Sequence, residues 1–252
     1  MTTNVDVAVV GAGPAGAAMA RRLAQCGCRV TLLERSRFEA PRVGESLAPA
    51  THPLLMDLGV WSEFMALAPL PSYGTRSVWG GAETQDHSHL MNPYGSVWHV
   101  DRSAFDCMLA EAAVAAGAEL RSGVSLVHCE AAGDGRWLLR FDEHGAGDPT
   151  LVRARVLVDA TGRSARLARW VGAERIVFDR LVGVATLFHD VDTSREGYIL
   201  VETTPDGWWY SAPLPGDRMM TMLMTDSDLC GRSSLSALER WREALTHAPA
   251  TR

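Results

Sequence analysis

The chain has 252 residues, 47% of them hydrophobic and 21% charged, with a formal net charge of −6. This length suits one large domain or two modest ones, and the acidic balance gives no electrostatic basis for binding nucleic acid or an anionic membrane. Because the chain has no apolar run of about 18 residues and no basic N-terminal signal, we expect a cytoplasmic protein without a membrane span.

The cysteine and lysine contents each exclude a class of site. The five cysteines are an odd number, and no second pair matches Cys26-Gly-Cys28, so neither a disulfide framework nor a metal site is predicted. All 24 Lys+Arg residues are arginines. A mechanism that depends on a catalytic lysine is therefore excluded within these 252 residues.

The N-terminal segment has the pattern of a dinucleotide-binding βαβ unit. Val5–Val10 is a mostly β-branched run typical of a buried parallel strand, and Gly11-Ala-Gly13-Pro-Ala-Gly16 follows it directly. A helix is predicted over Ala15–Cys26, and a second strand over Cys28–Leu33 ends at Glu34. Because strand, glycines, helix, second strand and terminal acid agree, this signal is far more specific than an isolated glycine motif.

Each part of this unit has a physical task in binding the ADP half of a dinucleotide. Gly11 permits the tight turn, Gly13 lets the backbone approach a pyrophosphate, and Gly16 lets the helix pack closely on the strand. The helix N-terminus offers free N–H groups to the phosphates, and the Glu34 carboxylate accepts hydrogen bonds from the adenosine ribose. The predicted cofactor-binding residues of this segment are Gly11, Gly13, Pro14, Ala15, Gly16, Glu34 and Arg35.

The segment after Glu34 separates FAD from NAD. An NAD domain would continue into another strand–helix repeat, whereas Arg42-Val-Gly44-Glu45-Ser46 predicts a turn that starts a helix continued by Thr51–Leu58. This segment resembles the Val-Gly-Glu-Ser/Ala segment of FAD-dependent monooxygenases and halogenases of the p-hydroxybenzoate hydroxylase fold, above all their tryptophan-halogenase-like branch. The resemblance implies flavin contacts from Arg42, Gly44, Glu45 and Ser46.

Two later blocks carry the same resemblance. Trp98-His-Val-Asp101-Arg102 begins an Ala-rich helix that runs to Gly117, and the arginine of such a helix reaches toward the flavin's polar chain in the family. A buried strand, Val152–Val158, runs into a turn that packs near the FAD pyrophosphate in the family. The resemblance therefore adds Arg102, Asp159, Thr161 and Gly162 to the expected FAD contacts.

The sequence of the turn at Thr161-Gly162 leaves open how FAD is reduced. Family members that bind NADPH directly usually carry Asp-Gly where this chain has Thr161-Gly162, and no second glycine fingerprint follows. These departures weaken the case for direct binding of a pyridine nucleotide. We expect FAD to be reduced by NAD(P)H either directly or through a separate flavin reductase.

The remaining chain is predicted to be mostly strands. A meander covering one side of the FAD-binding domain is expected over Glu119–Cys129, Arg136–Asp142 and Leu151–Val158. An antiparallel sheet is expected over Leu181–Asp190, Gly197–Thr204, Trp208–Leu214 and Arg218–Thr225, with an earlier contribution from Tyr73–Gly95. A helix with capping-box spacing opens at Ser236, and its apolar face is assigned to Leu238, Trp241 and Leu245.

Together these elements predict an α/β protein, with a Rossmann-type FAD-binding domain and an inserted antiparallel β-sheet substrate domain. The FAD-binding domain is assigned to residues 1–72 and 99–175, and the substrate domain to residues 73–98 and 176–252. The family's third FAD segment, a Gly-Asp-Ala-Ala type turn before a proline-containing helix, is absent. We therefore expect a chain truncated before that motif.

The resemblance implies that FAD supplies the oxidative chemistry, and it leaves three reactions open. In the first, a flavin C4a-hydroperoxide formed with molecular oxygen hydroxylates an aromatic substrate in a dry pocket, and no catalytic side chain is assigned. The second, halogenation, uses a lysine that this chain lacks, and Trp208-Trp-Tyr210-Ser-Ala212-Pro213 departs twice from the halogenase Trp-x-Trp-x-Ile-Pro. The third is reduction or dehydrogenation of the geranylgeranyl-reductase type. A flavin-binding protein without turnover is the non-enzymatic alternative.

The expected substrate is an aromatic small molecule or a residue of a partner polypeptide. The second possibility comes from Tyr73–Gly80 and Asn92–Trp98, which are similar to flavoproteins of quinone-cofactor maturation. The residues expected to wall the substrate pocket are Trp79, Trp98, Trp208, Trp209 and Tyr210. His99 is a candidate base, although a structural role is favoured for it.

Overall fold

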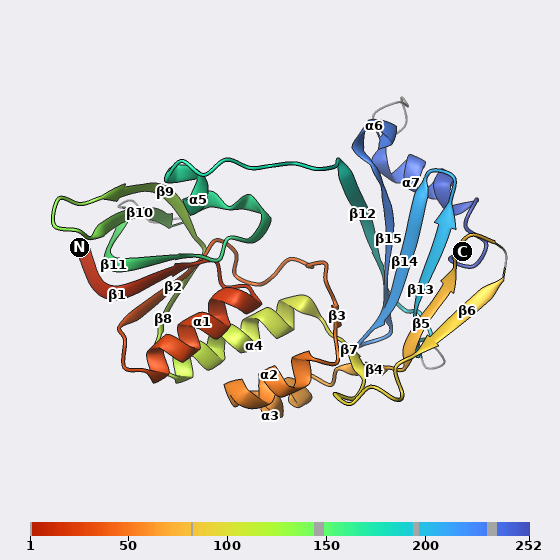
Figure 1. The fold of residues 1–252 in the computed structure, drawn as a ribbon, viewed down its shortest axis with the longest axis horizontal. Coiled ribbons are helices and arrows are strands. Elements are labelled where there is room, and N and C mark those ends of the chain that lie inside the picture. The colour runs from red at the N-terminus through yellow and green to blue at the C-terminus, as the bar shows by residue number, and fades with distance from the viewer. Residues whose placement is uncertain (1, 82, 144–148, 194–196, 231–235) are drawn as a thin grey trace. The chain divides into compact units, whose positions relative to one another are not determined.

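The computed structural model describes residues 2–81, 83–143, 149–193, 197–230 and 236–252 (Figure 1). The chain divides into two compact units. The first unit comprises Met1–Pro41, Met56–Phe64 and Ser103–Arg175. The second unit comprises Arg42–Leu55, Met65–Arg102 and Ile176–Arg252.

A six-stranded sheet forms the centre of the first unit, with the order β8-β2-β1-β11-β10-β9. The first four strands are parallel, and the last two continue the sheet as antiparallel neighbours. Its strands are β1 (Thr2–Val10), β2 (Val30–Glu34), β8 (Glu119–Ser122), β9 (Val124–Ala131), β10 (Trp137–Glu143) and β11 (Thr150–Asp159). The parallel strands are the Rossmann-type part of the predicted fold.

The single strand predicted over Glu119–Cys129 was wrong, because the chain is divided there into β8 and β9. Gly123 separates them with a φ of +75°, in the left-handed region that ends a strand and suits glycine. The division lets β8 pair with β2 while β9 joins the meander β9-β10-β11. Buried side chains of the meander, including Leu126, Leu139 and Phe141, share one core with Val5 and Leu33, while β10 and β9 continue the sheet beyond β11.

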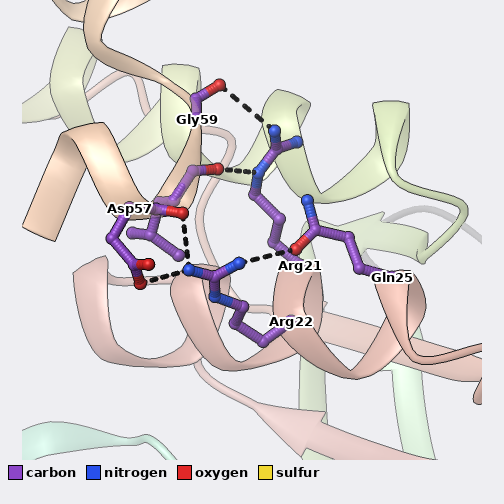
Figure 2. A network of polar contacts seen from close by, with 6 residues as sticks. Arg21, Arg22, Gln25, Asp57 and Gly59 are labelled. Atoms are coloured by element: carbon purple, nitrogen blue, oxygen red, sulfur yellow. Dashed lines mark hydrogen bonds and ion pairs between the residues drawn. The ribbon is translucent and has the colours of Figure 1, made fainter.

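The helices of the first unit are held to one another by arginine side chains. α1 (Pro14–Gln25) carries Arg21, which donates to Leu58 O at 2.8 Å and to Ala112 O of α4 (Arg102–Ala115) at 2.6 Å. The next residue, Arg22, binds both the backbone oxygen and the carboxylate of Asp57, at the end of α2 (Thr51–Leu58), as Figure 2 shows. Guanidinium groups suit this task because they donate in several directions at once.

Three short helices complete this part of the chain: α3 (Trp61–Ala66), the 3₁₀ turn η1 (Gly162–Ser164) and α5 (Arg166–Trp170). α3 buries Phe64, whose ring meets Phe105 of α4 edge-on with centroids 5.8 Å apart. This aromatic pair anchors the end of α3 in the first unit.

The second unit contains a six-stranded sheet with the order β12-β15-β14-β13-β5-β6. The strands are β5 (Gly74–Val78), β6 (Thr84–Ser88), β12 (Leu181–Phe188), β13 (Tyr198–Thr204), β14 (Gly207–Leu214) and β15 (Arg218–Asp226). Tyr73–Gly95 contributes two of them, as predicted. The expectation of a purely antiparallel sheet was wrong at one place, since β5 and β13 pair in parallel. The chain between these two strands passes through the first unit, so a hairpin does not force them to be antiparallel.

One face of this sheet is covered by α7 (Ala237–Leu245), which follows the short α6 (Ser227–Cys230). Ser236 and Glu239 form the predicted capping box at the start of α7. Trp241 is buried, contacts Trp209 edge-on with centroids 5.0 Å apart and donates from Nε1 to Val184 O at 3.0 Å. Leu238 was wrongly assigned to the apolar face, because its side chain is 49% exposed.

A three-stranded sheet, β3-β7-β4, completes the second unit. Its strands are β3 (Ser46–Leu47), β4 (Leu70–Ser72) and β7 (Val97–His99). The prediction that the Gly44–Ser46 turn starts a helix was therefore wrong. Ser46 and Leu47 pair with His99 and Trp98, and Pro49 disfavours helical backbone at the residue before it, so α2 begins separately at Thr51.

This small sheet also determines how the units are divided. The sequence assigned residues 42–72 and 99–102 to the FAD-binding domain. In the structure, Arg42–Leu55 and Met65–Arg102 belong to the second unit, because β3 and β4 pair with β7. Sequence position alone does not reveal such a pairing, since β3 and β7 are about fifty residues apart.

Candidate functional site

The glycine loop between β1 and α1 has the shape that the sequence predicts. Gly11 has a φ of +104°, and a side chain there would overlap Ala160 O. A side chain at Gly16 would overlap Gly11 O, so α1 packs against the loop only with glycine at that position. At Gly13, by contrast, an added Cβ would meet no atom within 4 Å. Gly13 is therefore the open position of the loop, where the backbone can be approached from outside.

Helix α1 begins at this open position. Gly13 is its N-cap residue, no side chain caps the helix, and Pro14 occupies the first turn. The N–H groups of the first turn, at Ala15 and Gly16, have no carbonyl of the helix before them. Such an uncapped N-terminus favours a phosphate, because the N–H groups and the helix dipole both attract negative charge.

Glu34 is buried beside this loop, at the end of β2. Its Oε2 accepts from Ala12 N at 2.8 Å, and its Oε1 accepts from Ser36 N at 3.1 Å and Ser36 Oγ at 2.8 Å. These bonds fix the carboxylate next to the glycine loop. A carboxylate oxygen has more than one acceptor site, so Glu34 can still bind a ribose hydroxyl. The next residue, Arg35, is exposed.

The turn after β11 lies against the same loop. Ala160 N donates to Val10 O at 2.9 Å, which holds the turn beside the end of β1. Asp159 accepts from Thr161 Oγ1 at 2.6 Å, Thr161 N at 3.0 Å and Ala168 N at 2.8 Å. Burial alone would raise the pKa of the Asp159 carboxyl, but these hydrogen bonds outweigh burial and lower the pKa below its usual range. Asp159 thus shapes the turn, and Thr161 and Gly162 lie within it.

The Gly44–Ser46 turn belongs to the second unit and is held by Arg102. Arg102 Nη1 donates to Val43 O and to Gly44 O, both at 3.0 Å. Gly44 has a φ of +96°, and an added Cβ there would lie 2.5 Å from Arg102 Nη1. Arg42, at the start of this segment, is half-buried. The side chain of Arg102 therefore takes part in shaping the turn whose residues the sequence assigned to the flavin.

A buried polar cluster continues from this turn; we call Glu45, Ser46, His99 and Tyr210 the Tyr210 cluster. Ser46 Oγ lies 2.9 Å from His99 Nδ1 and 2.6 Å from the Tyr210 hydroxyl. Glu45 is 1% exposed and accepts from Gly44 N at 2.8 Å. Burial raises the pKa of the Tyr210 hydroxyl. The Glu45 carboxylate raises this pKa further, through its negative charge and a hydrogen bond. Burial lowers the pKa of His99 from 6.5 to about 4, so this imidazole is neutral at physiological pH.

The sequence identified the members of this cluster but not their association. Glu45 and Ser46 were assigned to the flavin, Tyr210 to the substrate pocket, and His99 to a structural role. The signal available in the sequence was a few separate polar residues at places otherwise expected to be buried, on strands far apart in the chain. Only the pairing of β3 with β7 brings Ser46 opposite His99.

The aromatic residues predicted to wall a pocket are divided, because β14 places them on both faces of the larger sheet of the second unit and Trp98 lies on the small sheet. Trp209 was wrongly included, because it is fully buried in a core with Leu223 and Trp241. Side chains alternate along a strand, so Trp208 and Tyr210 point to the opposite face. Trp79 is 55% exposed, and its ring centroid lies 6.4 Å from that of Trp208. Trp98, on β7, is half-buried.

The face that carries Trp208 and Tyr210 is rich in methionine. Met224 pairs with Trp208, Met222 with Tyr210 and Met220 with Ala212 across β14 and β15, so all three share this face. We call it the methionine face. Its side chains are apolar, polarizable and adaptable, which suits contact with an aromatic ring.

The first unit thus has the glycine loop, uncapped helix and terminal acid that suit the ADP half of a dinucleotide, and a chain that joins such a unit to a mixed sheet has the architecture of a flavin-dependent oxidoreductase. The chain belongs to the FAD-binding domain family, whose model matches residues 4–248. This match confirms the resemblance on which the sequence interpretation rests. Within the part of the chain that the structure describes, every helix is too short or too polar to cross a membrane.

Three relatives illustrate the family. The chain is 33% identical over 250 residues to the putative FAD-dependent oxidoreductase LodB of Marinomonas mediterranea, covering 98% of this chain and 67% of LodB. It is 28% identical over 257 residues to tryptophan 2-halogenase of Chondromyces crocatus, covering 99% of this chain and 49% of the halogenase. The structure of the myxobacterial chondrochloren halogenase CndH superposes with a TM-score of 0.88 at 25% identity, covering 99% of this chain and 59% of CndH. The chain therefore spans half to two thirds of these proteins.

Proposed function

We propose that the protein is an FAD-dependent oxygenase that hydroxylates an aromatic substrate. The observation that carries this proposal is the complete absence of lysine from a chain that otherwise follows the halogenase-like pattern. Halogenation in the resembling family uses a lysine near the substrate, whereas direct transfer of oxygen to an electron-rich ring needs no such side chain. FAD, when bound, supplies the activation of molecular oxygen.

The chain's own residues suit this cofactor. The open backbone at Gly13 and the N-terminus of α1 would hold the pyrophosphate, and Glu34 would bind the adenosine ribose. Thr161 and Gly162 would complete this part of the site. In the second unit, the Gly44–Ser46 turn held by Arg102 would lie along the flavin.

The methionine face is where we place the aromatic substrate. Trp208, Met222 and Met224 provide an apolar surface that excludes water and can pack against a ring. Tyr210 lies on the same face, but its hydroxyl is already engaged by Ser46. We infer that the substrate is bound mainly by packing and shape, either as a small molecule or as an aromatic side chain of a partner polypeptide.

Halogenation is the second candidate, because the matched relatives include tryptophan 2-halogenase and the structure of CndH. A third candidate, reduction, is favoured by digeranylgeranylglycerophospholipid reductase 1 of Methanothermobacter thermautotrophicus, which is 27% identical over 277 residues and of which the chain covers 63%. We base neither halogenation nor reduction on a particular residue of this chain, whereas hydroxylation is supported by the missing lysine.

Isotope labelling separates these reactions. The full-length, FAD-loaded protein is reduced by NADH with a flavin reductase and exposed to ¹⁸O₂ with chloride and free tyrosine, free tryptophan or a tyrosine-containing peptide. Hydroxylation predicts one ¹⁸O atom in an aromatic product, found by mass spectrometry. A chlorinated product would establish halogenation instead. Release of all the oxygen as hydrogen peroxide with every probe would contradict both oxygen-dependent proposals.

A further inference from the structure

The hydroxyl group of Ser46 lies at the centre of the Tyr210 cluster. It lies between His99 Nδ1, at 2.9 Å, and the Tyr210 hydroxyl, at 2.6 Å. A hydroxyl has one hydrogen and donates it to only one neighbour at a time. If that hydrogen is donated to one of these two neighbours, the direction of one bond determines the direction of the other, and with it the tautomer of His99.

Two arrangements use the Ser46 hydrogen within the cluster. In the first, His99 Nδ1–H donates to Ser46, Ser46 donates to Tyr210, and Tyr210 donates to the Glu45 carboxylate. In the second, Tyr210 donates to Ser46, Ser46 donates to Nδ1, and the imidazole hydrogen lies on Nε2.

The surroundings of His99 distinguish these arrangements. His99 Nε2 is buried and has no hydrogen-bond partner among the residues that the structure describes. Buried N–H groups without an acceptor are rarer in folded proteins than buried acceptors without a donor, so the second arrangement is disfavoured. The first arrangement also gives the buried Glu45 carboxylate a second donor beside Gly44 N.

We propose that Tyr210 is a positioning residue, which fixes the Gly44–Ser46 turn through a one-way chain of hydrogen bonds from His99 through Ser46 and Tyr210 to Glu45. This changes the role predicted for Tyr210, from a wall of the substrate pocket to a support of the turn. The part of the inference that concerns FAD rests on the proposed function, since it needs the flavin to lie on this turn.

The geometry explains why one side chain has this effect. Glu45 and Ser46 belong to the turn, whereas Tyr210 comes from β14 and His99 from β7. The backbone already joins the turn to β7, through the pairing of Ser46 with His99 and the bond from Val100 N to Glu45 O at 2.9 Å. The Tyr210 hydroxyl links this pair to the larger sheet of the same unit.

The test is nuclear magnetic resonance of the full-length protein labelled with ¹⁵N-histidine, in which H99Q assigns the His99 signals. We expect the neutral Nδ1–H tautomer in the wild-type protein. In Y210F, and equally in E45A, the chain is broken and the Nε2–H tautomer should become populated. Y198F is the matched control, because Tyr198 lies on the opposite face of the sheet beside Arg76, and it should leave the His99 signals unchanged.

A wild-type Nε2–H tautomer would overturn the proposed direction of the chain. An unchanged His99 spectrum in both Y210F and E45A would overturn the chain itself, and two variants ensure a result if one fails to fold. This measurement needs neither FAD nor turnover, so a failure of the proposed oxygenase activity would leave it intact.

The positioning role has its own measurement. FAD affinity, from titration of the apoprotein, should fall about fivefold to tenfold in Y210F, the loss expected for one hydrogen bond, and should be unchanged in Y198F. A Y210F protein that changes the tautomer but binds FAD as tightly as the wild type, with an unaltered flavin spectrum, would contradict the positioning role.

Discussion

The glycine loop of the first unit and the Tyr210 cluster of the second unit are held in shape by different means. The loop is built from backbone within one short segment, and its shape requires that Gly11 and Gly16 have no side chains. The cluster is built from side chains on three separate segments, joined by directional hydrogen bonds. The difference teaches that local sequence can specify a backbone-built site, whereas a side-chain-built site depends on strands that meet only in the folded chain.

The largest expected effect separates two glycines of the same loop. In G16A the added methyl group would overlap the backbone of Gly11, so helix and strand must move apart. We expect the free energy of unfolding to fall by about 3 kcal/mol, the upper part of the range for overpacking. Chemical denaturation measures this change. A loss below about 1 kcal/mol would mean that the loop is less tightly packed than its glycines suggest.

The second prediction concerns pH and the Tyr210 cluster. The pKa of His99 is lowered to about 4 in the folded chain, against about 6.5 when unfolded. Below pH 6.5 the unfolded chain therefore binds the proton that the folded chain refuses, and stability is lost as the pH falls from 6.5 toward 4. Between pH 7.5 and pH 5 we expect a loss of about 2 kcal/mol from this group.

Denaturation curves of the wild-type protein and H99Q at the two pH values test this expectation. The variant lacks the imidazole, so its stability should depend less on pH by the same amount. Equal pH dependence in the two proteins would show that His99 is accessible to protons in the folded state.

The third prediction sharpens the comparison within the glycine loop. Gly13 has an ordinary φ of −70°, and an added Cβ would meet no atom, so G13A should change the free energy of unfolding by less than about 1 kcal/mol. The same methyl group would occupy the space of a bound pyrophosphate. We expect FAD affinity to fall at least about tenfold, or about 1.4 kcal/mol.

Titration of the apoprotein with FAD, followed by flavin fluorescence, measures this effect. G13A is also the control for G16A, since both add one methyl group to the same loop. Unchanged FAD binding in a folded G13A protein would argue against the assignment of this loop to the pyrophosphate.

The smallest expected effect concerns Arg102, whose side chain holds the Gly44–Ser46 turn in shape. R102A removes two charge-assisted hydrogen bonds to the carbonyls of Val43 and Gly44. Because Arg102 is partly exposed, water replaces much of this interaction, and we expect a loss of about 1 kcal/mol in stability. R102K should recover little of it, because both bonds come from Nη1, which the planar guanidinium holds in a fixed direction, whereas a lysine must bring a strongly hydrated ammonium there on a flexible chain. Full recovery in R102K would show that charge alone holds the turn.

Much of the first unit was predictable because its signals are local. The Val5–Val10 run, the three glycines and Glu34 specify a strand, a loop and the end of a second strand within a short segment, and each lies where it was predicted. The capping box at Ser236 was equally predictable, since it needs only residues three apart. The errors arose where a local pattern has two readings, as at Gly123 and at the Gly44–Ser46 turn.

The sequence by itself determined the family, the cofactor and the βαβ unit, because glycine spacing and strand–helix alternation are patterns between residues close together in the sequence. It also determined that no lysine among these 252 residues can take part in a reaction, because the sequence contains none. Only the tertiary structure decided that Trp209 belongs to the core, that β5 pairs in parallel with β13, and that the Tyr210 hydroxyl meets Ser46. The physical reason is that burial and hydrogen-bond direction depend on which strands become neighbours, and a residue's own neighbours in sequence carry little information about that.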